Sequence, residues 1–523
     1  MAMNPETKLR NFHAAHWDEQ LIYDQSVPGE RGILIPEPEA DLAGLPGSAA
    51  LGAFQRKKTP NLPEINQMKV NRHYMRLSQE ASCAVDLTIN ISEGTCTMKY
   101  SPKVQEHIAA RNPGIVEVHP LQDPETMQGI LEIYHETEKY LCAISGLDAF
   151  TFQPGGGGQA IYTAGSIMRA YHRAMGNTEK DTIITTSFSH PVDSATPATN
   201  GFKLITLLPD ENGYPDVEAL KQVVDEHTAG LFMTNPEDTG LYNPRVTEYV
   251  EAIHGVGGLC FYDQANANGM LGIARAKEAG FDMCHFNLHK TFSAPHGSYG
   301  PACGATGCRE FLKKYLPVPR VGFDGSQYTL DWDCPDSIGM VRSFLGNMGV
   351  VLKTYMWIRT LGPDGLRACA ICSVLNNNYM EKHLRATKGI SIWYGKGRRR
   401  LEQVRYAWDV LKNETGIGTN DINSRIQDFG LPDYWLTHPP YMVPEPMTLE
   451  PCESYSKEDM DEYLAVLREA SREAYEEPDI FKKVPPFNSA CHTPTIGEVE
   501  KLEDLACSWR LYKKNMESRI KGK

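Results

Sequence analysis

The most informative segment of this chain is Asn287-Leu288-His289-Lys290-Thr291-Phe292-Ser293-Ala294-Pro295-His296-Gly297. Its mostly apolar start predicts the end of a buried strand, and its second half predicts a turn. Most lysines are solvated surface charges, but a lysine at such a strand end is partly buried. Desolvation lowers the pKa of a buried lysine, so more of it remains a free, nucleophilic amine. We therefore expect Lys290 to act as a nucleophile.

Asp263 ends an earlier apolar run, directly after Phe261-Tyr262. Open α/β sheets bind ligands at the carboxyl ends of their strands. A lysine that forms a Schiff base with an aldehyde, and a carboxylate that keeps a pyridine nitrogen protonated, are the groups that pyridoxal 5'-phosphate (PLP) requires. The alternative is that Asp263 only caps the next helix. We predict that Asp263 pairs with PLP and that the small Ala265 lets the cofactor ring lie against the backbone.

A run of glycines at residues 155–158 precedes a predicted helix that begins near Gln159. Backbone N–H groups and the dipole at such a helix start can hold a phosphate, although a glycine run is more often only a flexible loop. Two residues after strand ends are further candidates. Asn235 could donate to the phenolic oxygen of PLP or serve only in an Asn-Pro turn, and His190 could stack on the ring or be a structural histidine.

The candidate active-site residues divide into two groups. The predicted catalytic residues are Lys290, Asp263 and His190. The predicted cofactor-binding residues are Gly156, Gly157, Gly158, Gln159, Asn235, Asp263, Ala265, His289 and Lys290.

A metal site is the rival interpretation of the same region. His285 and His289, with His296 nearby, have the spacing at which two histidines on a helix bind zinc. Residues 282–287 are typical of a strand, however, and no glutamate lies between the first two histidines to act as a base. We therefore expect no metal.

Residues from about 131 to 300 alternate between short apolar runs and amphipathic segments. The runs predict strands at residues 182–188, 203–208, 230–234 and 258–262, and helices are predicted at 131–144, 159–175, 217–227 and 246–254. Strands between helices indicate βαβ units and a mainly parallel sheet that is covered on both faces, which is an α/β fold.

Three domains are predicted. Residues 1–130 are rich in Pro and Gly and predict an extended N-terminal arm, residues 131–360 a large PLP-binding domain, and residues 361–523 a smaller C-terminal α+β domain that follows the helix breaker Gly362-Pro363. In this last domain we expect a helix at 366–384 and a strand at 390–394. A further helix of about 20 residues should open at Ser456, which begins an S-x-x-D capping pattern.

The 523-residue chain has a net charge of −14, which argues against a nucleic acid or an anionic membrane surface as partner, because either favours a basic patch. No apolar stretch reaches the roughly 20 residues of a membrane helix, and no secretory signal is expected. Thirteen cysteines without disulfide-like spacing indicate a reducing, cytoplasmic location. We expect Cys369 and Cys372 to pack in the core rather than bind metal, and Cys96 to be packed rather than reactive.

Three groups of motifs are similar to those of one family. They are Gly94-Thr95-Cys96-Thr97-Met98-Lys99-Tyr100-Ser101-Pro102-Lys103, the stretch Asn287 to Gly297, and the C-terminal pattern Val443-Pro444-Glu445, Glu450-Pro451 and Glu453 with Ser456-Lys457-Glu458. Together they resemble subunit 2 of glycine dehydrogenase (decarboxylating), the P-protein of the glycine cleavage system. The resemblance implies a fold type I, aspartate aminotransferase-like PLP enzyme in which Lys290 binds the cofactor.

The resemblance also implies an activity and partners. The implied reaction acts at the α-carbon of glycine or a related amino acid, which forms an external aldimine and loses carbon dioxide. The aminomethyl group then passes to the lipoyl arm of the H-protein. A homologous subunit 1 is the implied companion, in a heterotetramer, and a homodimer is the alternative because fold type I enzymes commonly dimerise.

The chain departs from the family pattern near the cofactor. Ile161 replaces a carboxylate, Ser298 and Tyr299 interrupt a glycine run, and Glu402 aligns with a histidine. The family's His-Gly-Thr-Asn-Pro is here His190-Pro191-Val192-Asp193-Ser194. Unpaired polar groups cost about 1–3 kcal/mol each, so such exchanges can change the substrate. Two alternatives therefore stay open: a divergent PLP-dependent paralogue that performs transamination, aldol-type cleavage or a specialised biosynthetic step, and a non-catalytic partner subunit.

Overall fold

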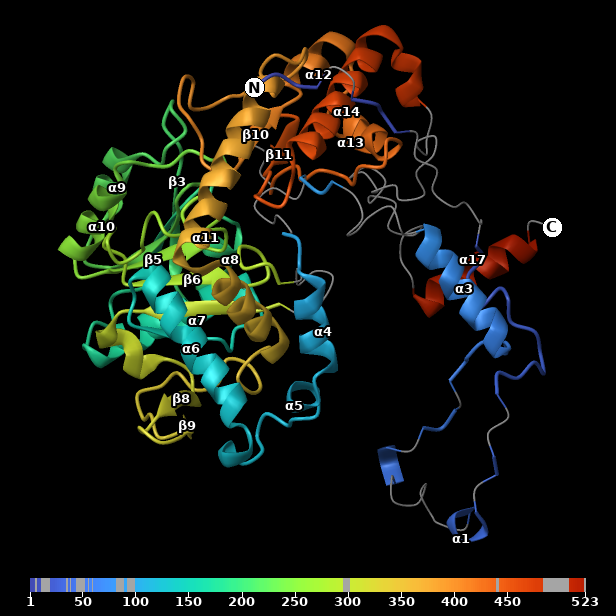
Figure 1. Cartoon of the computed structure of the whole chain (residues 1–523), viewed down its shortest axis with the longest axis horizontal. Coiled ribbons are helices and arrows are strands. Elements are labelled where there is room, and N and C mark those ends of the chain that lie inside the picture. The colour runs from blue at the N-terminus through green and yellow to red at the C-terminus, as the bar shows by residue number, and fades with distance from the viewer. Residues whose placement is uncertain are drawn as a thin grey trace. The chain divides into compact units, whose positions relative to one another are not determined.

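The computed structural model describes residues 1–4, 7–10, 19–33, 36–37, 39–43, 52–54, 56–58, 60–80, 89–91, 99–294, 302–438, 442–482 and 508–521 (Figure 1). The chain divides into two units, which are described separately below. Unit 1 consists of Met1–Leu9, Ile89–Asn423 and Asp433–Phe481, and unit 2 consists of Arg10–Thr88, Ser424–Pro432 and Lys482–Lys523.

Short apolar runs form a seven-stranded sheet in unit 1. Its strands are β1 (Ala149–Thr151), β2 (Thr182–Thr186), β3 (Lys203–Leu207), β4 (Thr228–Thr234), β5 (Leu259–Gln264), β6 (Met283–Asn287) and β7 (Gly304–Cys308), in the spatial order β1-β7-β6-β5-β4-β2-β3. The strands from β6 to β3 are parallel to one another, and β7 is antiparallel to both β6 and β1. The predicted α/β fold with a mainly parallel sheet is therefore confirmed.

Five helices alternate with these strands. They are α6 (Gln128–Ser145), α7 (Gly157–Ala174), α8 (Val192–Thr199), α9 (Val217–Val223) and α10 (Val246–Gly255). Four of them match the predicted amphipathic segments to within a few residues. The sequence does not predict α8, because Pro197 lies inside it and proline is rare within helices.

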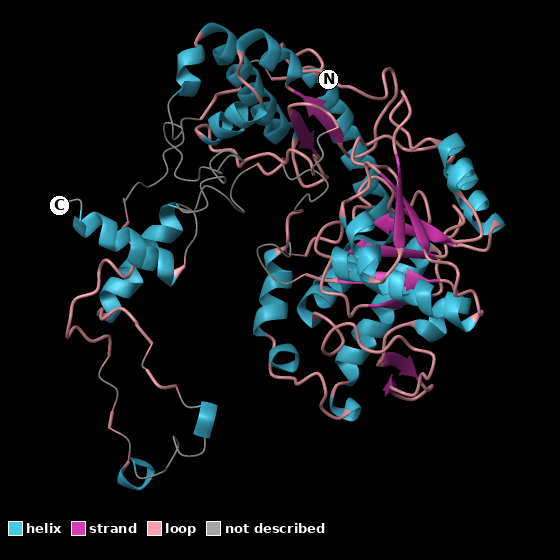
Figure 2. Ribbon diagram, turned by 180° about the vertical axis from the view of Figure 1, so that it is seen from behind, coloured by secondary structure: helices cyan, strands magenta, loops and turns pink. Residues whose placement is uncertain are grey.

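Helices cover both faces of the sheet, as Figure 2 shows. Helix α7 packs on one face, where Ile161 lies in a buried cluster with Ile183 and Phe232. Helices α6 and α10 pack on the other face, in a second cluster that includes Ile184. Successive strand residues such as Ile183 and Ile184 point to opposite faces, and both are fully buried. This two-sided burial explains why the central strands β4 and β5 are largely apolar.

Further helices and strands precede α6 and follow β7. Before α6 come α4 (Lys103–Arg111), α5 (Pro113–Val116) and η3 (Pro124–Thr126). After β7 come η4 (Glu310–Tyr315), β8 (Arg320–Phe323), β9 (Tyr328–Asp331), α11 (Met348–Leu384), β10 (Val404–Ala407), α12 (Asp409–Thr415), α13 (Thr419–Gln427), β11 (Pro446–Leu449), α14 (Lys457–Glu476) and η5 (Pro478–Lys482). Strands β10 and β11 form an antiparallel pair, as do β8 and β9.

Helix α11 links the sheet layer to the second part of unit 1. It contacts α6, α4 and α14. Lys353, before Gly362, pairs with Glu106 of α4, and the Tyr379 hydroxyl, after Gly362, donates to Asp461 of α14. Gly362 has a left-handed backbone (φ 63°) that interrupts the helix, where the sequence predicts a domain boundary. Cys369 is buried, as predicted, whereas Cys372 is exposed, because it lies beyond the edge of the buried face of α11.

Two predictions for the C-terminal part have opposite outcomes. The strand at 390–394 is wrong, since Ser391 forms only an isolated bridge with Ala407. The helix that opens at Ser456 is confirmed as α14, with 20 residues. Its capping box is complete, because the Ser456 Oγ accepts from the Asp459 N–H at 3.1 Å and the Asp459 carboxylate accepts from the Ser456 N–H at 2.9 Å.

Unit 2 contains α1 (Ala40–Ala43), η1 (Gly52–Phe54), α3 (Gln67–Glu80) and α17 (Trp509–Lys521). Within it the ring of Tyr23 packs against Trp509, with ring centroids 4.8 Å apart. Helix α3 lies in the segment predicted to be an irregular arm, so this part of the chain is more regular than expected. Among the described residues, no helix has the length and apolar character needed to span a membrane.

Candidate functional site

The carboxyl end of β5 places Asp263 in the middle of the sheet edge. Its register neighbours are Thr234 at the end of β4 and His285 in β6. The Asp263 side chain is almost fully buried, and its Oδ1 accepts a hydrogen bond from the Ala265 N–H at 2.8 Å. The predicted strand-end position is thus confirmed, at the edge where open α/β sheets bind ligands.

Lys290 lies three residues beyond the end of β6, in a turn in which its N–H donates to the carbonyl of Asn287 at 3.0 Å. Its residue is only 6% exposed, which excludes the ordinary role of a solvated surface lysine. The charge of Lys290 contributes to lowering the pKa of both His190 and His285. The lysine and these two histidines therefore share one electrostatic environment with Asp263, which also acts on both rings.

Opposing effects set the ionisation of Asp263. Burial works against its charge, whereas His285, the Ala265 N–H, His190 and the neighbouring Asp193 favour it, and the pKa of Asp263 is lowered. His285 is fully buried, and this burial lowers its own pKa, whereas the charge of Asp263 opposes the shift. Its Nδ1 lies 3.5 Å from the Asp263 Oδ1.

The glycine loop precedes α7 as predicted. Among the described residues no side chain caps this helix, so its first N–H groups have no side-chain cap there. A Cβ on Gly157 would lie 3.0 Å from the Nδ2 of Asn287, which means that the helix start is pressed against the end of β6. The uncapped helix start thus adjoins the strand that leads to Lys290, where an anion would meet backbone N–H donors.

Gln159 holds this loop through both polar atoms of its side chain. Its Oε1 accepts from the Gly155 N–H at 2.7 Å, and its Nε2 donates to the carbonyl of Val341 at 3.1 Å. A structural role for the Gln159 side chain therefore stands beside its predicted role in cofactor binding.

Asn235 and His289 also have protein partners. The Asn235 Oδ1 accepts from the Asn243 N–H at 2.8 Å, and the Asn235 Nδ2 donates to the Asn243 carbonyl at 3.2 Å. The loop after β4 therefore orients the Asn235 side chain. The His289 Nδ1 lies 3.1 Å from the carbonyl oxygen and 3.3 Å from the N–H of Cys303. These contacts tie the turn that carries Lys290 to the start of β7.

His190 lies between β2 and α8, and its ring meets that of His438 edge to face, with centroids 4.4 Å apart. Burial, followed by the charges of Lys290 and His438, lowers the pKa of His190 to about 4. The ring is therefore neutral at physiological pH, as a ring that stacks on an aromatic cofactor would be.

Several residues of the site are missed by sequence reasoning. Asp193, at the start of α8, lies against Asp263 and is fully buried. A cavity of about 250 Å³ beside His190 is lined by Ser189, Ser194, Asp238, Arg405 and His438, among others. In the wall of this cavity, Arg405 and Asp238 form an ion pair of 2.8 Å. These residues come from distant elements, and only Asp193, within the altered His190 motif, carries a signal in the sequence.

The family departures lie in different places. Ile161 is packed in the core between α7 and the sheet. An aliphatic side chain therefore fits the apolar surroundings of this position, where the family has a carboxylate. Glu402 is buried, and its Oε2 has no hydrogen-bond partner in the described part of the chain. Burial, followed by the charge of Glu450, raises the pKa of Glu402 to about 8. The predictions for Cys96, His296, Gly297, Ser298 and Tyr299 concern residues that lie outside the described part of the chain.

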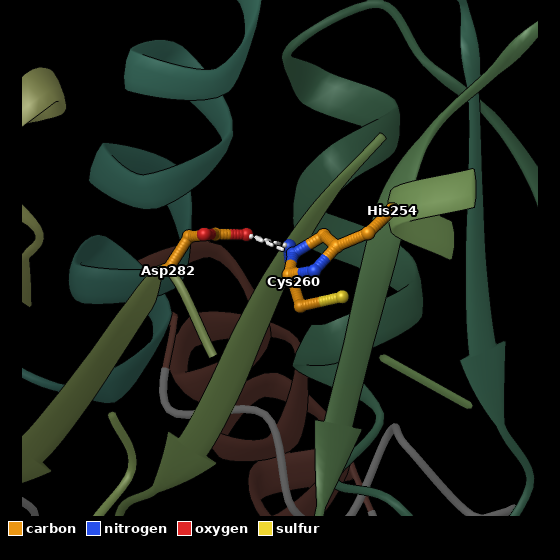
Figure 3. Close-up of side chains that lie close together, drawn as sticks. All are labelled: His254, Cys260 and Asp282. Atoms are coloured by element: carbon orange, nitrogen blue, oxygen red, sulfur yellow. Dashed lines mark hydrogen bonds and ion pairs between the residues drawn. The ribbon is translucent and has the colours of Figure 1, made fainter. Parts of the chain in front are cut away.

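Metal-ligand groups gather at another place in the described chain. Figure 3 shows His254, Cys260 and Asp282, whose ligand atoms lie within 4.8 Å of one another. The Asp282 Oδ2 already accepts from the His254 Nε2 and from the Cys260 N–H, both at 2.8 Å. Burial raises the pKa of the Cys260 thiol. This cluster lies at the amino ends of β5 and β6, away from the strand ends that carry Asp263 and Lys290.

The residues at the strand ends fit PLP. Both side chains of His285 and Asn287 are buried. Among the described residues, the two ring nitrogens of His285 and the Oδ1 of Asn287 have no hydrogen-bond partner. Buried polar groups normally have partners, so the site has polar atoms to offer to a bound molecule. A buried lysine, a buried ionised aspartate and an uncapped helix start are the groups that bind an aldehyde, a pyridinium and a phosphate.

Comparisons with known proteins agree with this geometry. Residues 369–492 match the family model described as glycine dehydrogenase, C-terminal domain. The chain is 39% identical over 507 residues to the probable glycine dehydrogenase (decarboxylating) subunit 2 of Pyrococcus horikoshii, covering 96% of this chain and 98% of that one. It is 37% identical over 498 residues to the protein of the same name from Halalkalibacterium halodurans, covering 92% and 96%.

Solved structures show the same fold. A glycine decarboxylase (P-protein) of the glycine cleavage system, in inhibitor-bound form, has a TM-score of 0.68 at 20% identity and covers 84% of this chain and 100% of its own. A sphingosine-1-phosphate lyase of Burkholderia pseudomallei has a TM-score of 0.55 at 15% identity and covers 87% and 98%. The predicted fold type I architecture is thus confirmed.

Proposed function

The chain belongs to the glycine dehydrogenase (decarboxylating) subunit 2 family, and we propose that it is a PLP-dependent enzyme that decarboxylates glycine. One observation carries the assignment of the cofactor: the buried Lys290 and Asp263 lie at the ends of adjacent strands, β6 and β5. The family supplies the substrate, since the relatives are named for the decarboxylation of glycine.

Each residue has a proposed task. The amine of Lys290 attaches the cofactor and yields it to the incoming amino acid. The Asp263 carboxylate keeps the ring nitrogen protonated, and the N–H groups at the start of α7 hold the phosphate. The neutral ring of His190 stacks on the cofactor and excludes water. When bound, PLP supplies an electron sink for the electron pair that is left as carbon dioxide departs.

Replacing the lysine tests the cofactor site. We expect Lys290→Ala to abolish the visible absorbance that PLP acquires when an enzyme lysine holds it. Lys353→Ala is a matched control, because Lys353 is also buried and lies on α11, where it pairs with Glu106 of α4. A visible band that persists in the Lys290→Ala protein would contradict the assignment.

An exchange assay tests the reaction and the partners. The family name of subunit 2 implies a companion subunit 1, and we propose that a lipoyl H-protein accepts the aminomethyl group. With glycine, H-protein, subunit 1 and labelled bicarbonate, label should enter the carboxyl group of glycine, and it should not do so with Lys290→Ala. Bound PLP without exchange would indicate a different reaction at the same site.

A further inference from the structure

A second buried carboxyl group lies beside Asp263. Asp193 is the second residue of α8 and is 0% exposed. Its Oδ2 has only a long hydrogen bond, 3.4 Å, from the Thr234 hydroxyl, and its buried Oδ1 has no hydrogen-bond partner among the described residues once both acids are taken as ionised. Leaving a buried carboxylate with so little support is unfavourable.

Asp193 and Asp263 are close enough to form a side-chain hydrogen bond with each other. Two carboxylates in contact cannot both be ionised without strong repulsion, so one of them keeps a proton. Asp263 is the better-supported anion, because it accepts from the Ala265 N–H at 2.8 Å and lies 3.5 Å from His285. Asp193 has no comparable support, so the shared proton belongs to it.

The surrounding titratable groups favour the same distribution. Burial and then Asp263 raise the pKa of Asp193 well above its ordinary value, and Asp238 also raises it. His285 lies beside Asp263 and favours its charge. The negative charge of Asp238, which follows β4, and the contact between His285 and Asp263 thus both place the proton on Asp193.

We propose that Asp193 is a protonated positioning residue, whose O–H donates to the Asp263 carboxylate so that the two acids together present a single negative charge at the end of β5. The part of this proposal that concerns PLP rests on the proposed function, because that charge would face the cofactor ring nitrogen. The acid pair itself depends only on the protein.

This pair has a defined task. A hydrogen bond to an ionised acceptor is short and strong, so it fixes the carboxylate of Asp263 in one orientation. It also draws charge from that carboxylate and thereby moderates its basicity. The similar family pattern has asparagine at this position, and an amide offers the same donor and acceptor shape without a titrating proton. Asp193→Asn is therefore the conservative variant.

The pH dependence of stability tests the shared proton in the full-length chain. Because the folded state keeps a proton on Asp193 that the unfolded state has lost, the wild type loses stability as pH rises from the ordinary aspartate value toward the raised one. Asp193→Asn removes this loss. Between pH 5 and pH 8, we expect the unfolding equilibrium constants of wild type and variant to diverge by up to roughly tenfold per pH unit.

Infrared spectroscopy tests the same proton without unfolding. A protonated carboxyl group has a carbonyl band separate from that of carboxylates. The difference spectrum of wild type minus Asp193→Asn at pH 7 should contain such a band, because the other protonated acids of the fold, Glu237 and Glu402, contribute equally to both proteins. Parallel stability curves, or a wild-type spectrum from which the variant removes only a carboxylate band, would overturn the proposal.

Cofactor titration tests the positioning role. Asp193→Asn should bind PLP within a few-fold of the wild type, whereas Asp193→Ala, which cannot donate to Asp263, should bind about tenfold more weakly. Unchanged binding by Asp193→Ala would overturn the positioning role. Failure of the proposed function is distinguishable, because a visible band retained by Lys290→Ala leaves the infrared and stability results for the acid pair unaffected.

Discussion

Buried charges at the edge of the site are held by specific partners. Arg405 and Asp238 form an ion pair of 2.8 Å with both side chains almost fully buried, and the Arg405 Nε also donates to the Thr448 hydroxyl at 3.2 Å. The attraction of such a pair roughly offsets the loss of hydration, but removing one partner leaves the other charge buried and uncompensated. The wall of the cavity beside His190 therefore depends on the pair remaining complete.

Breaking this pair should destabilise the protein. We expect Arg405→Met to lower the free energy of unfolding by about 3 kcal/mol, because Asp238 keeps a buried charge, and Arg405→Met with Asp238→Asn to recover part of the loss. Urea unfolding followed by circular dichroism measures both. Arg245→Met is the matched control, since the Arg245–Glu248 pair is on the surface and should matter little. Equal effects of the two single variants would contradict this expectation.

At the scale of the element, the start of α7 is built for close approach. A Cβ on Gly157 would lie 3.0 Å from Asn287 Nδ2 and 3.3 Å from its Oδ1, closer than most such contacts, whereas a Cβ on Gly158 would meet only the Val192 Cγ1 at 3.9 Å. Position 158 therefore has room for a larger side chain and position 157 does not, a difference that the glycine run at residues 155–158 does not reveal.

This difference gives a paired prediction. Gly157→Ala should lower the free energy of unfolding by about 1 kcal/mol or more, because the buried Asn287 side chain must shift, and it should weaken PLP binding by disturbing the site beside Lys290. Gly158→Ala should instead be neutral or stabilising by roughly 0.5 kcal/mol through helix propensity. Thermal unfolding of the protein without PLP separates the two, and the reverse order would show that the α7 start is not pressed against Asn287.

Elements differ in how far the sequence predicts them. Strands β2, β4 and β5 are predicted because each is a short run of apolar or β-branched residues buried on both faces. Strand β3 lies at the edge of the sheet and is only partly buried, but its β-branched residues still predict it. Strand β7 is missed because its sequence, Gly304-Ala-Thr-Gly-Cys308, lacks the usual bulk; Gly307 must be small, as a Cβ there would lie 2.3 Å from the Phe150 ring. The segment at 390–394 has strand composition, but Asp409 binds the Ser391 hydroxyl and the Trp393 indole instead.

The site shows the same division. Lys290 and Asp263 are predicted because their chemistry is specific and each follows a recognisable strand. His285, Asp193 and Arg405 are missed because each acquires its meaning only from a neighbour on another element, such as Asp263 beside Asp193. Single-sequence patterns report local periodicity, and they do not report which strand ends become neighbours.

At the scale of the whole molecule, several buried acids couple stability to pH. Burial is the main cause that raises the pKa of both Glu402 and Glu237 to about 8. Glu450 adds to the effect on Glu402, whereas a hydrogen bond from the Thr186 hydroxyl opposes it on Glu237. Both carboxyl groups therefore keep their protons in the folded state near neutral pH, and each contributes stability that is lost as pH rises.

Removing one of these acids should flatten the pH profile of stability. The folded state binds the Glu402 proton from the ordinary glutamate value of 4.5 up to about pH 8, so the free energy of unfolding of the wild type falls by about 1.4 kcal/mol per pH unit from this group across that window. Glu402→Gln keeps the shape and cannot ionise. Its melting temperature should match that of the wild type below pH 5 and exceed it increasingly toward pH 8. Glu237→Gln should show the same trend, because its burial is equally complete, and a gap between variant and wild type that does not change with pH would show that Glu402 is ionised in the folded protein.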